Sequence, residues 1–158
     1  MLKPILLVED NPKDLELTLI ALGKSNLANE VIAVRDGAEC LDYLHMRGAY
    51  ADRPKGHPAV VLLDLKLPKV DGLQVLEEIK QNRELQGVPV VMLTTSREEQ
   101  DLVRSYKLGV NAYVVKPVNF KEFMQAVQEL GVFWAVVNEP PPGSFKPVRA
   151  PFADGPTD

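Results

Sequence analysis

The sequence has few cysteines, no excess of positive charge and no long hydrophobic run, and each shortage excludes a class of protein. Cys40, the single cysteine among 158 residues, cannot form an intrachain disulfide, and no Cys and His cluster has zinc-site spacing. The longest early apolar stretch, Ile5–Val8, is far too short to cross a membrane, and we expect no signal peptide because the start Met-Leu-Lys-Pro lacks its apolar region and cleavage site. We therefore expect a cytoplasmic protein without a membrane partner.

The charge balance and the overall composition narrow the possibilities further. A net charge of −4 argues against direct binding of nucleic acid, because that binding depends on cations that neutralise phosphates. With 46% hydrophobic and 25% charged residues, the chain fits one globular domain. The prolines after Glu139 make regular structure improbable there. We expect a domain over residues 1–138 and a proline-rich tail or arm over residues 139–158.

Short apolar runs alternate with helix-like segments along the chain. The runs are continuous rather than alternating in polarity, which is typical of strands covered by helices on both faces. The predicted strands are residues 4–8, 31–34, 59–63, 88–93 and 112–115. Helix starts are predicted at Asn11 with Pro12, Asp36, Asp71 with Gly72, Ser96 and Asn119. This βα alternation predicts an α/β fold with a doubly wound, five-stranded parallel sheet.

Polar side chains stand at the ends of four of these runs. Glu9 and Asp10 follow the first, Asp64 closes the third, Thr94 follows the fourth and Lys116 follows the fifth. In an open parallel sheet, ligands bind beyond the carboxyl ends of the strands, so these groups should share one crevice. Such a crevice can hold a divalent cation and a phosphoryl group.

The chemistry of these side chains favours magnesium and phosphoryl transfer. Two carboxylates about 4 Å apart at an effective dielectric constant near 20 repel by roughly 4 kcal/mol, so a cation should offset their charge. Magnesium prefers hard oxygen ligands, and we expect Asp10 and Asp64 to bind it directly, with Glu9 acting through water. An ionised Asp64 is also a competent nucleophile towards phosphorus. Lys116 and Thr94 can compensate the charge on the phosphoryl oxygens.

These segments resemble the receiver domains of two-component response regulators. The resemblance extends over residues 4 to about 131, and its motifs are Val8-Glu9-Asp10-Asn11, Leu63-Asp64-Leu65-Lys66-Leu67-Pro68, Asp71-Gly72, Leu93-Thr94-Thr95-Ser96 and Tyr113-Val114-Val115-Lys116-Pro117. It implies a flavodoxin-like sheet with the strand order 2-1-3-4-5. It also implies a function as a phospho-acceptor in phosphorelay signalling rather than as an enzyme with a diffusible substrate.

The same resemblance implies roles for individual residues. Asp64 would be the phospho-acceptor, and Glu9 and Asp10 would be the acidic pair of the metal site. The backbone carbonyl of Lys66 would be a third protein ligand to magnesium. The bond between Lys116 and Pro117 would be cis. Thr94 and Tyr113 would form the switch pair of the family, with the threonine pulled towards the phosphoryl group and the aromatic ring turning inward.

Other features of the resemblance and of the sequence indicate the protein partners. The phosphoryl donor in the family is a phosphohistidine on a sensor histidine kinase. The long loop over residues 47–58, the segment around Phe133 and Trp134, and the proline-rich tail resemble single-domain regulators partnered with bacterial phytochrome kinases. Phe133 and Trp134 lie in an apolar stretch that either packs on its own domain or anchors a homodimer.

Other functions fit the residues less well. A haloacid dehalogenase type of phosphatase needs a second aspartate two positions after the nucleophile, where Lys66 stands. A nucleotide hydrolase needs a glycine-rich loop, but Thr18 occupies the first required glycine before Gly23 and Lys24. A receiver-like interaction module that acts without phosphorylation remains the main alternative.

Overall fold

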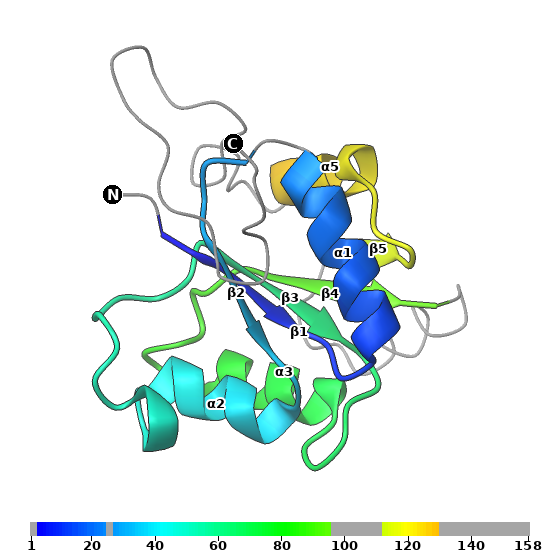
Figure 1. The fold of residues 1–158 in the computed structure, drawn as a ribbon. Coiled ribbons are helices and arrows are strands. Elements are labelled where there is room, and N and C mark those ends of the chain that lie inside the picture. Colours follow the sequence, from blue (N-terminus) through cyan, green and yellow to red (C-terminus); the bar gives the residue numbers. More distant parts are fainter. Residues whose placement is uncertain (1–2, 25–26, 96–111, 130–158) are drawn as a thin grey trace, which may run out of the picture.

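The computed structural model describes residues 3–24, 27–95 and 112–129, and it has a parallel sheet at its centre (Figure 1). The five strands lie in the order β2-β1-β3-β4-β5, as predicted. The strands are β1 (Ile5–Val8), β2 (Val31–Val34), β3 (Val60–Asp64), β4 (Val90–Thr94) and β5 (Tyr113–Val115). The described helices are α1 (Pro12–Lys24), α2 (Gly37–His45), the short 3-10 helix η1 (Gly48–Tyr50), α3 (Gly72–Gln81) and α5 (Phe120–Glu129).

Helices cover both faces of the sheet. Helices α2 and α3 lie on one face, and α1 and α5 lie on the other (Figure 1). Successive β1 residues alternate between the two cores: Leu6 and Val8 join the α2 and α3 side, whereas Ile5 and Leu7 join the α1 and α5 side. Because both faces are buried, the strands have no polar face, which explains their continuous apolar sequence.

Side-chain caps fix the helix starts that the sequence predicted. The Asn11 Oδ1 accepts hydrogen bonds from the backbone of Lys13 and Asp14 at 2.9 and 3.0 Å. The Asp36 side chain accepts one from the Glu39 backbone, and Asp71 forms a capping box with Gln74. Asn119 caps α5 through the Glu122 backbone at 2.9 Å. These polar groups satisfy helix N–H groups that lack an intrahelical partner.

Two strand ends lie slightly further along the chain than predicted. Asp64 and Thr94 are the last residues of β3 and β4, not the first residues beyond them. The reason is that the neighbouring strands still offer partners there: the Leu65 N–H donates to the Leu93 carbonyl, and the Lys116 N–H donates to the Thr94 carbonyl. Strand geometry therefore fixes the backbone of both polar residues.

The loop over residues 47–58 has more structure than its composition suggests. Within it, η1 places Tyr50 edge-on against Tyr43 of α2, with ring centroids 5.2 Å apart. The Arg53 guanidinium lies 4.1 Å from the Tyr43 ring centroid, and its Nε donates to the Tyr43 carbonyl. Tyrosine and arginine contacts thus attach the loop to α2.

Several predictions fall outside the described residues. Phe133 and Trp134, the proline-rich tail over residues 139–158 and the helix expected after Ser96 belong to this group. The dimer contact and the division into domain and tail therefore stay predictions. None of the helices in the described part of the chain is long and apolar enough to span a bilayer.

Candidate functional site

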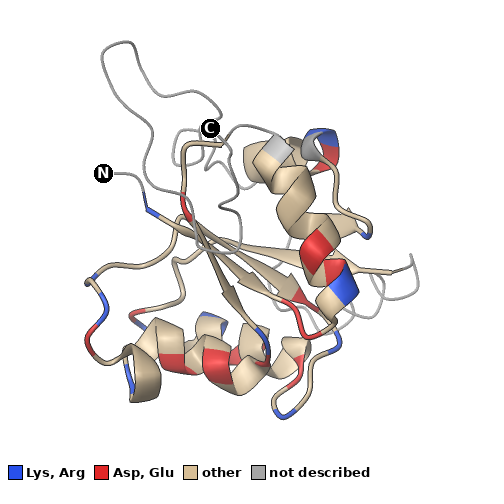
Figure 2. Cartoon of the chain, in the orientation of Figure 1, with Lys and Arg blue, Asp and Glu red and all other residues tan. Residues whose placement is uncertain are grey.

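Acidic residues gather where the strands end and α1 begins, and red segments of the ribbon lie in this region in Figure 2. Glu9, Asp10 and Asp64 each offer a carboxylate oxygen, and these oxygens lie within 4.8 Å of one another. Glu9 and Asp64 are buried, whereas Asp10 is exposed. The structure thus brings together the three carboxylates that the sequence placed at the ends of two separate strands.

One ammonium group lies among these acids. The Lys116 Nζ donates to Glu9 Oε1 at 2.9 Å and to Asp64 Oδ2 at 3.0 Å. It also donates to Asp14 Oδ2 at 3.0 Å. The Lys116 side chain is 11% exposed, so little water screens these contacts. The following bond, from Lys116 to Pro117, is cis, as the resemblance implied.

Local backbone contacts hold the acids in place. The Asn11 N–H donates to Glu9 Oε2 at 3.2 Å, and the Lys66 N–H donates to Asp64 Oδ1 at 3.3 Å. The turn after β3 is compact, because the Gly72 N–H donates to the Leu65 carbonyl at 3.0 Å. A Cβ at Gly72 would lie 2.2 Å from the Asp64 carbonyl oxygen, so only glycine fits. Glycine therefore permits the close approach that fixes the backbone of Asp64.

Thr94 and Tyr113, the expected switch pair, lie on adjacent strands. Thr94 is fully buried at the end of β4, next to β3, and its Oγ1 has no hydrogen-bond partner among the described residues. Tyr113 begins β5 and packs partly buried against the core on the α2 and α3 side. A buried hydroxyl without an acceptor costs about 1–3 kcal/mol, so Thr94 has a donor available for an additional group.

The electrostatics of the site follow from burial and crowding of the acids. Burial and, to a smaller extent, the nearby Asp64 carboxyl raise the pKa of Glu9 to about 7, against the opposing effect of Lys116. Burial alone would lower the pKa of Lys116, but its hydrogen bond to Glu9 and the charge of Asp64 outweigh that effect and raise it. Lys116 thus stays a cation, and the acids carry more negative charge than it can neutralise.

Sequence reasoning did not predict the role of Asp14 as a partner of Lys116. The available signal was its position: Asp14 stands in the first turn of α1, and that helix begins directly after the acidic pair. A helix that starts at the carboxyl end of β1 brings its first turn close to the neighbouring strand ends.

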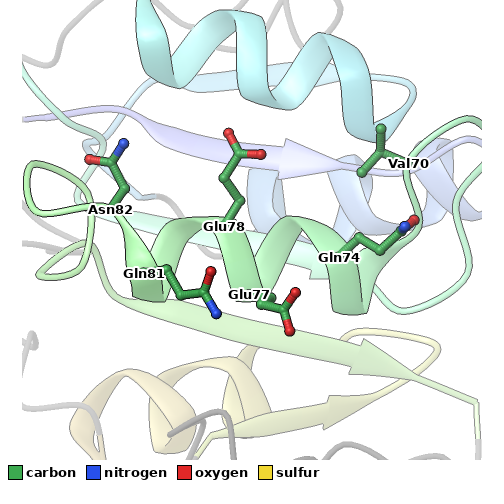
Figure 3. Close-up of a pocket in the computed structure, with 6 residues that line it drawn as sticks. All are labelled: Val70, Gln74, Glu77, Glu78, Gln81 and Asn82. Atoms are coloured by element: carbon green, nitrogen blue, oxygen red, sulfur yellow. The ribbon is translucent and has the colours of Figure 1, made fainter.

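A separate surface hollow has different chemistry. It lies along α3 and has six lining residues: Val70, Gln74, Glu77, Glu78, Gln81 and Asn82 (Figure 3). The lining includes two carboxylates and no cation, so it offers nothing to hold a phosphoryl group. The strand-end cluster is therefore the candidate site.

A flavodoxin-like parallel sheet with an acid cluster and a lysine at its carboxyl edge defines a receiver domain. The chain belongs to the response regulator receiver domain family, whose model matches residues 5–128. It is 46% identical over 132 residues to the response regulator Rcp1 of Synechocystis sp., which covers 84% of this chain and 88% of that protein. The chain is thus a response regulator in phosphorelay signal transduction.

Solved structures place the chain near regulators of bacterial phytochromes. The bacteriophytochrome response regulator AtBRR is 69% identical, with a TM-score of 0.85, covering 88% of this chain and 99% of that one. The bacteriophytochrome response regulator RtBRR is 65% identical, with a TM-score of 0.83, covering 91% and 87%. These similarities confirm the resemblance to phytochrome-associated regulators.

Two further similar structures contain a metal ion or a phosphoryl group. One is the Mn²⁺-bound form of Rcp1, at 42% identity and a TM-score of 0.65, covering 92% of this chain and 99% of that one. The other is the phosphorylated cyanobacterial phytochrome response regulator RcpA, at 45% identity and a TM-score of 0.67, covering 85% and 94%. Receiver domains bind divalent metal, and the acid cluster of this chain fits such an ion.

Proposed function

We propose that Asp64 is the residue that accepts the phosphoryl group, and that its phosphorylation switches a protein-interaction surface. One observation carries the proposal: the buried Asp64 carboxylate lies 3.0 Å from the Lys116 ammonium and belongs to a cluster of three carboxylates. A nucleophile, a compensating cation and hard oxygen ligands are the components that phosphoryl transfer to an aspartate needs.

The proposed step balances as a displacement at phosphorus. A carboxylate oxygen of Asp64 forms a new bond to the phosphorus of a phosphohistidine on a sensor kinase. The bond from phosphorus to the imidazole nitrogen breaks, and the electron pair stays on that nitrogen. The product is an acyl phosphate on Asp64, and the Lys116 ammonium transfers its hydrogen bond from the carboxylate to a phosphoryl oxygen.

The donor set suits a hard divalent cation, and we propose Mg²⁺. Carboxylate oxygens of Glu9, Asp10 and Asp64 would hold it, together with the backbone carbonyl of Lys66. The Mn²⁺-bound structure of Rcp1 supports a divalent ion at this type of site. When bound, the cation neutralises charge on the phosphoryl oxygens and so favours the transfer.

Thr94 and Tyr113 are the proposed switch. A phosphoryl dianion on Asp64 would lie next to β4 and would accept a hydrogen bond from any donor that reaches it. The buried Thr94 hydroxyl has no other acceptor among the described residues. Movement of Thr94 leaves space near β5, which Tyr113 can fill. The phosphorylated structure of RcpA supports phosphorylation as the signal in this group of proteins.

The partner is a sensor histidine kinase, and we propose a bacteriophytochrome because AtBRR and RtBRR are bacteriophytochrome response regulators. The proposal includes no nucleic-acid or membrane partner and no turnover of a diffusible substrate. A homodimer built on Phe133 and Trp134 and a cytoplasmic location stay predictions. The alternative of an interaction module without phosphorylation is not favoured, because the site keeps a nucleophile, a lysine and a cation cluster.

Intact-mass spectrometry after incubation with acetyl phosphate and Mg²⁺ tests the acceptor. We expect a phosphoryl adduct on the wild type that disappears in EDTA and in Asp64→Asn. Asp52→Asn is the matched control, because Asp52 is an exposed aspartate of the long loop, and it should be labelled like the wild type.

An adduct that persists in Asp64→Asn would show that another residue is the acceptor. If the wild type gives no adduct, a beryllofluoride titration distinguishes rapid hydrolysis, in which the analogue still binds, from a site that does not accept a phosphoryl group.

A further inference from the structure

Asp14 is a fourth acid at the site, and its position differs from that of the other three. It lies in the first turn of α1, where the Asn11 cap holds its backbone N–H at 3.0 Å. Its carboxylate accepts a hydrogen bond from Lys116 at 3.0 Å, and its side chain is 37% exposed. It is not part of the cluster of carboxylates within 4.8 Å that can share a metal ion. Its charge therefore acts on the site through Lys116 and through space.

Lys116 has no spare donor in this arrangement. An ammonium group carries three N–H donors, and the three acceptors on Glu9, Asp14 and Asp64 match that number. A phosphoryl group on Asp64 must take one of these donors. Asp14 competes for the same ammonium and adds a negative charge near the incoming dianion, so both effects oppose phosphoryl binding.

We propose that Asp14 acts through Lys116. It accepts a hydrogen bond from the ammonium that the phosphoryl group would otherwise receive, and it thereby weakens binding of the phosphoryl group at the site. This inference rests on the proposed function of Asp64. Asp14 would make the phosphorylated state less favourable, without binding the metal or the phosphoryl group itself.

The opposite role, in which Asp14 orients Lys116 for the phosphoryl group, is less well supported. Glu9 and Asp64 already hold the ammonium at 2.9 and 3.0 Å, and both are buried. The lysine therefore has two buried anchors without Asp14. The two roles predict effects of opposite sign, so a single titration separates them.

The test is a beryllofluoride titration of the full chain in Mg²⁺, followed by ¹⁹F NMR. Removal of the charge in Asp14→Asn should tighten binding of this phosphoryl analogue by about three- to tenfold. The gain should shrink as ionic strength rises, because salt screens a partly exposed charge. Asp14→Ala removes the same charge without adding an amide that could disturb the helix start, and it should also tighten binding of the analogue.

The matched control is Glu16→Gln, which makes the same change in charge at an exposed position of the same helix. It should bind the analogue like the wild type. Equal tightening in Glu16→Gln would assign the effect to net charge and overturn the proposal, as would unchanged or weaker binding in both Asp14 variants. If the wild type itself does not bind beryllofluoride, the proposed phospho-acceptor function fails instead, which is a distinguishable result.

Discussion

At the scale of single residues, the site depends on polar groups that the fold keeps buried despite their cost. Lys116 neutralises part of the charge of Glu9 and Asp64, and these ion pairs are almost shielded from water. Removal of one partner from such a pair leaves an uncompensated buried charge, which is far more costly than the pair itself. The function of the site therefore explains polar groups that stability alone would not favour.

Thr94 provides a direct test of this cost. Its hydroxyl is buried without a partner among the described residues, so Thr94→Val should raise the free energy of unfolding by about 1 kcal/mol in EDTA. Urea denaturation measures this change. A less stable Thr94→Val protein would show that the hydroxyl has a partner in the resting state.

At the scale of elements, the turn between β3 and α3 controls the position of Asp64. A Cβ at Gly72 would lie 2.2 Å from the Asp64 carbonyl oxygen and 2.7 Å from that of Leu65. Both oxygens belong to the backbone and cannot rotate away, so Gly72→Ala should cost about 2 kcal/mol or more of stability. Thermal or urea unfolding measures the loss.

Gly87 is the matched control for this substitution. A Cβ there meets no atom within 4 Å, so Gly87→Ala should be neutral or stabilise by about 0.4–1 kcal/mol through the unfolded chain. Equal stability of the two variants would show that the β3–α3 turn can move aside, and that Gly72 is not required for its geometry.

At the scale of the whole molecule, Glu9 should link stability to pH and to metal. Its pKa lies at about 7 in the folded chain, above the value of 4.5 for the free side chain. Between these values the folded protein binds more protons than the unfolded one, so the free energy of unfolding in EDTA should fall as pH rises from about 5 to about 7. Urea denaturation at a series of pH values measures the slope.

Metal changes this dependence, because a carboxylate ligand must lose its proton to bind a cation. The apparent affinity for Mg²⁺ should therefore rise with pH up to about 7 and then level off. In Glu9→Gln, both the free energy of unfolding and the apparent affinity for Mg²⁺ should depend less on pH over this range. If Glu9→Gln keeps the wild-type slope, another group is responsible for the dependence.

Several features of the fold could be predicted from local sequence. The continuous apolar runs identified the strands, since neighbouring residues of β1 and β3 pack against helices on opposite faces. Asn11, Asp36 and Asp71 predicted helix starts because capping depends on residues only two or three positions apart. The exact ends of the strands were harder to predict, because the backbone hydrogen bonds beyond Leu63 depend on the neighbouring strand β4.

The sequence by itself determined that the acids, the threonine and the lysine of the site follow apolar strand segments, to within a residue of the strand ends, because strand and helix patterns are local properties. Only the tertiary structure decided that Asp14 shares Lys116 with Glu9 and Asp64, and that burial shifts the pKa of Glu9. Asp14 and Lys116 are 102 residues apart, and burial depends on every element that packs around a group. Contacts and electrostatics of this kind exist only once the chain has folded.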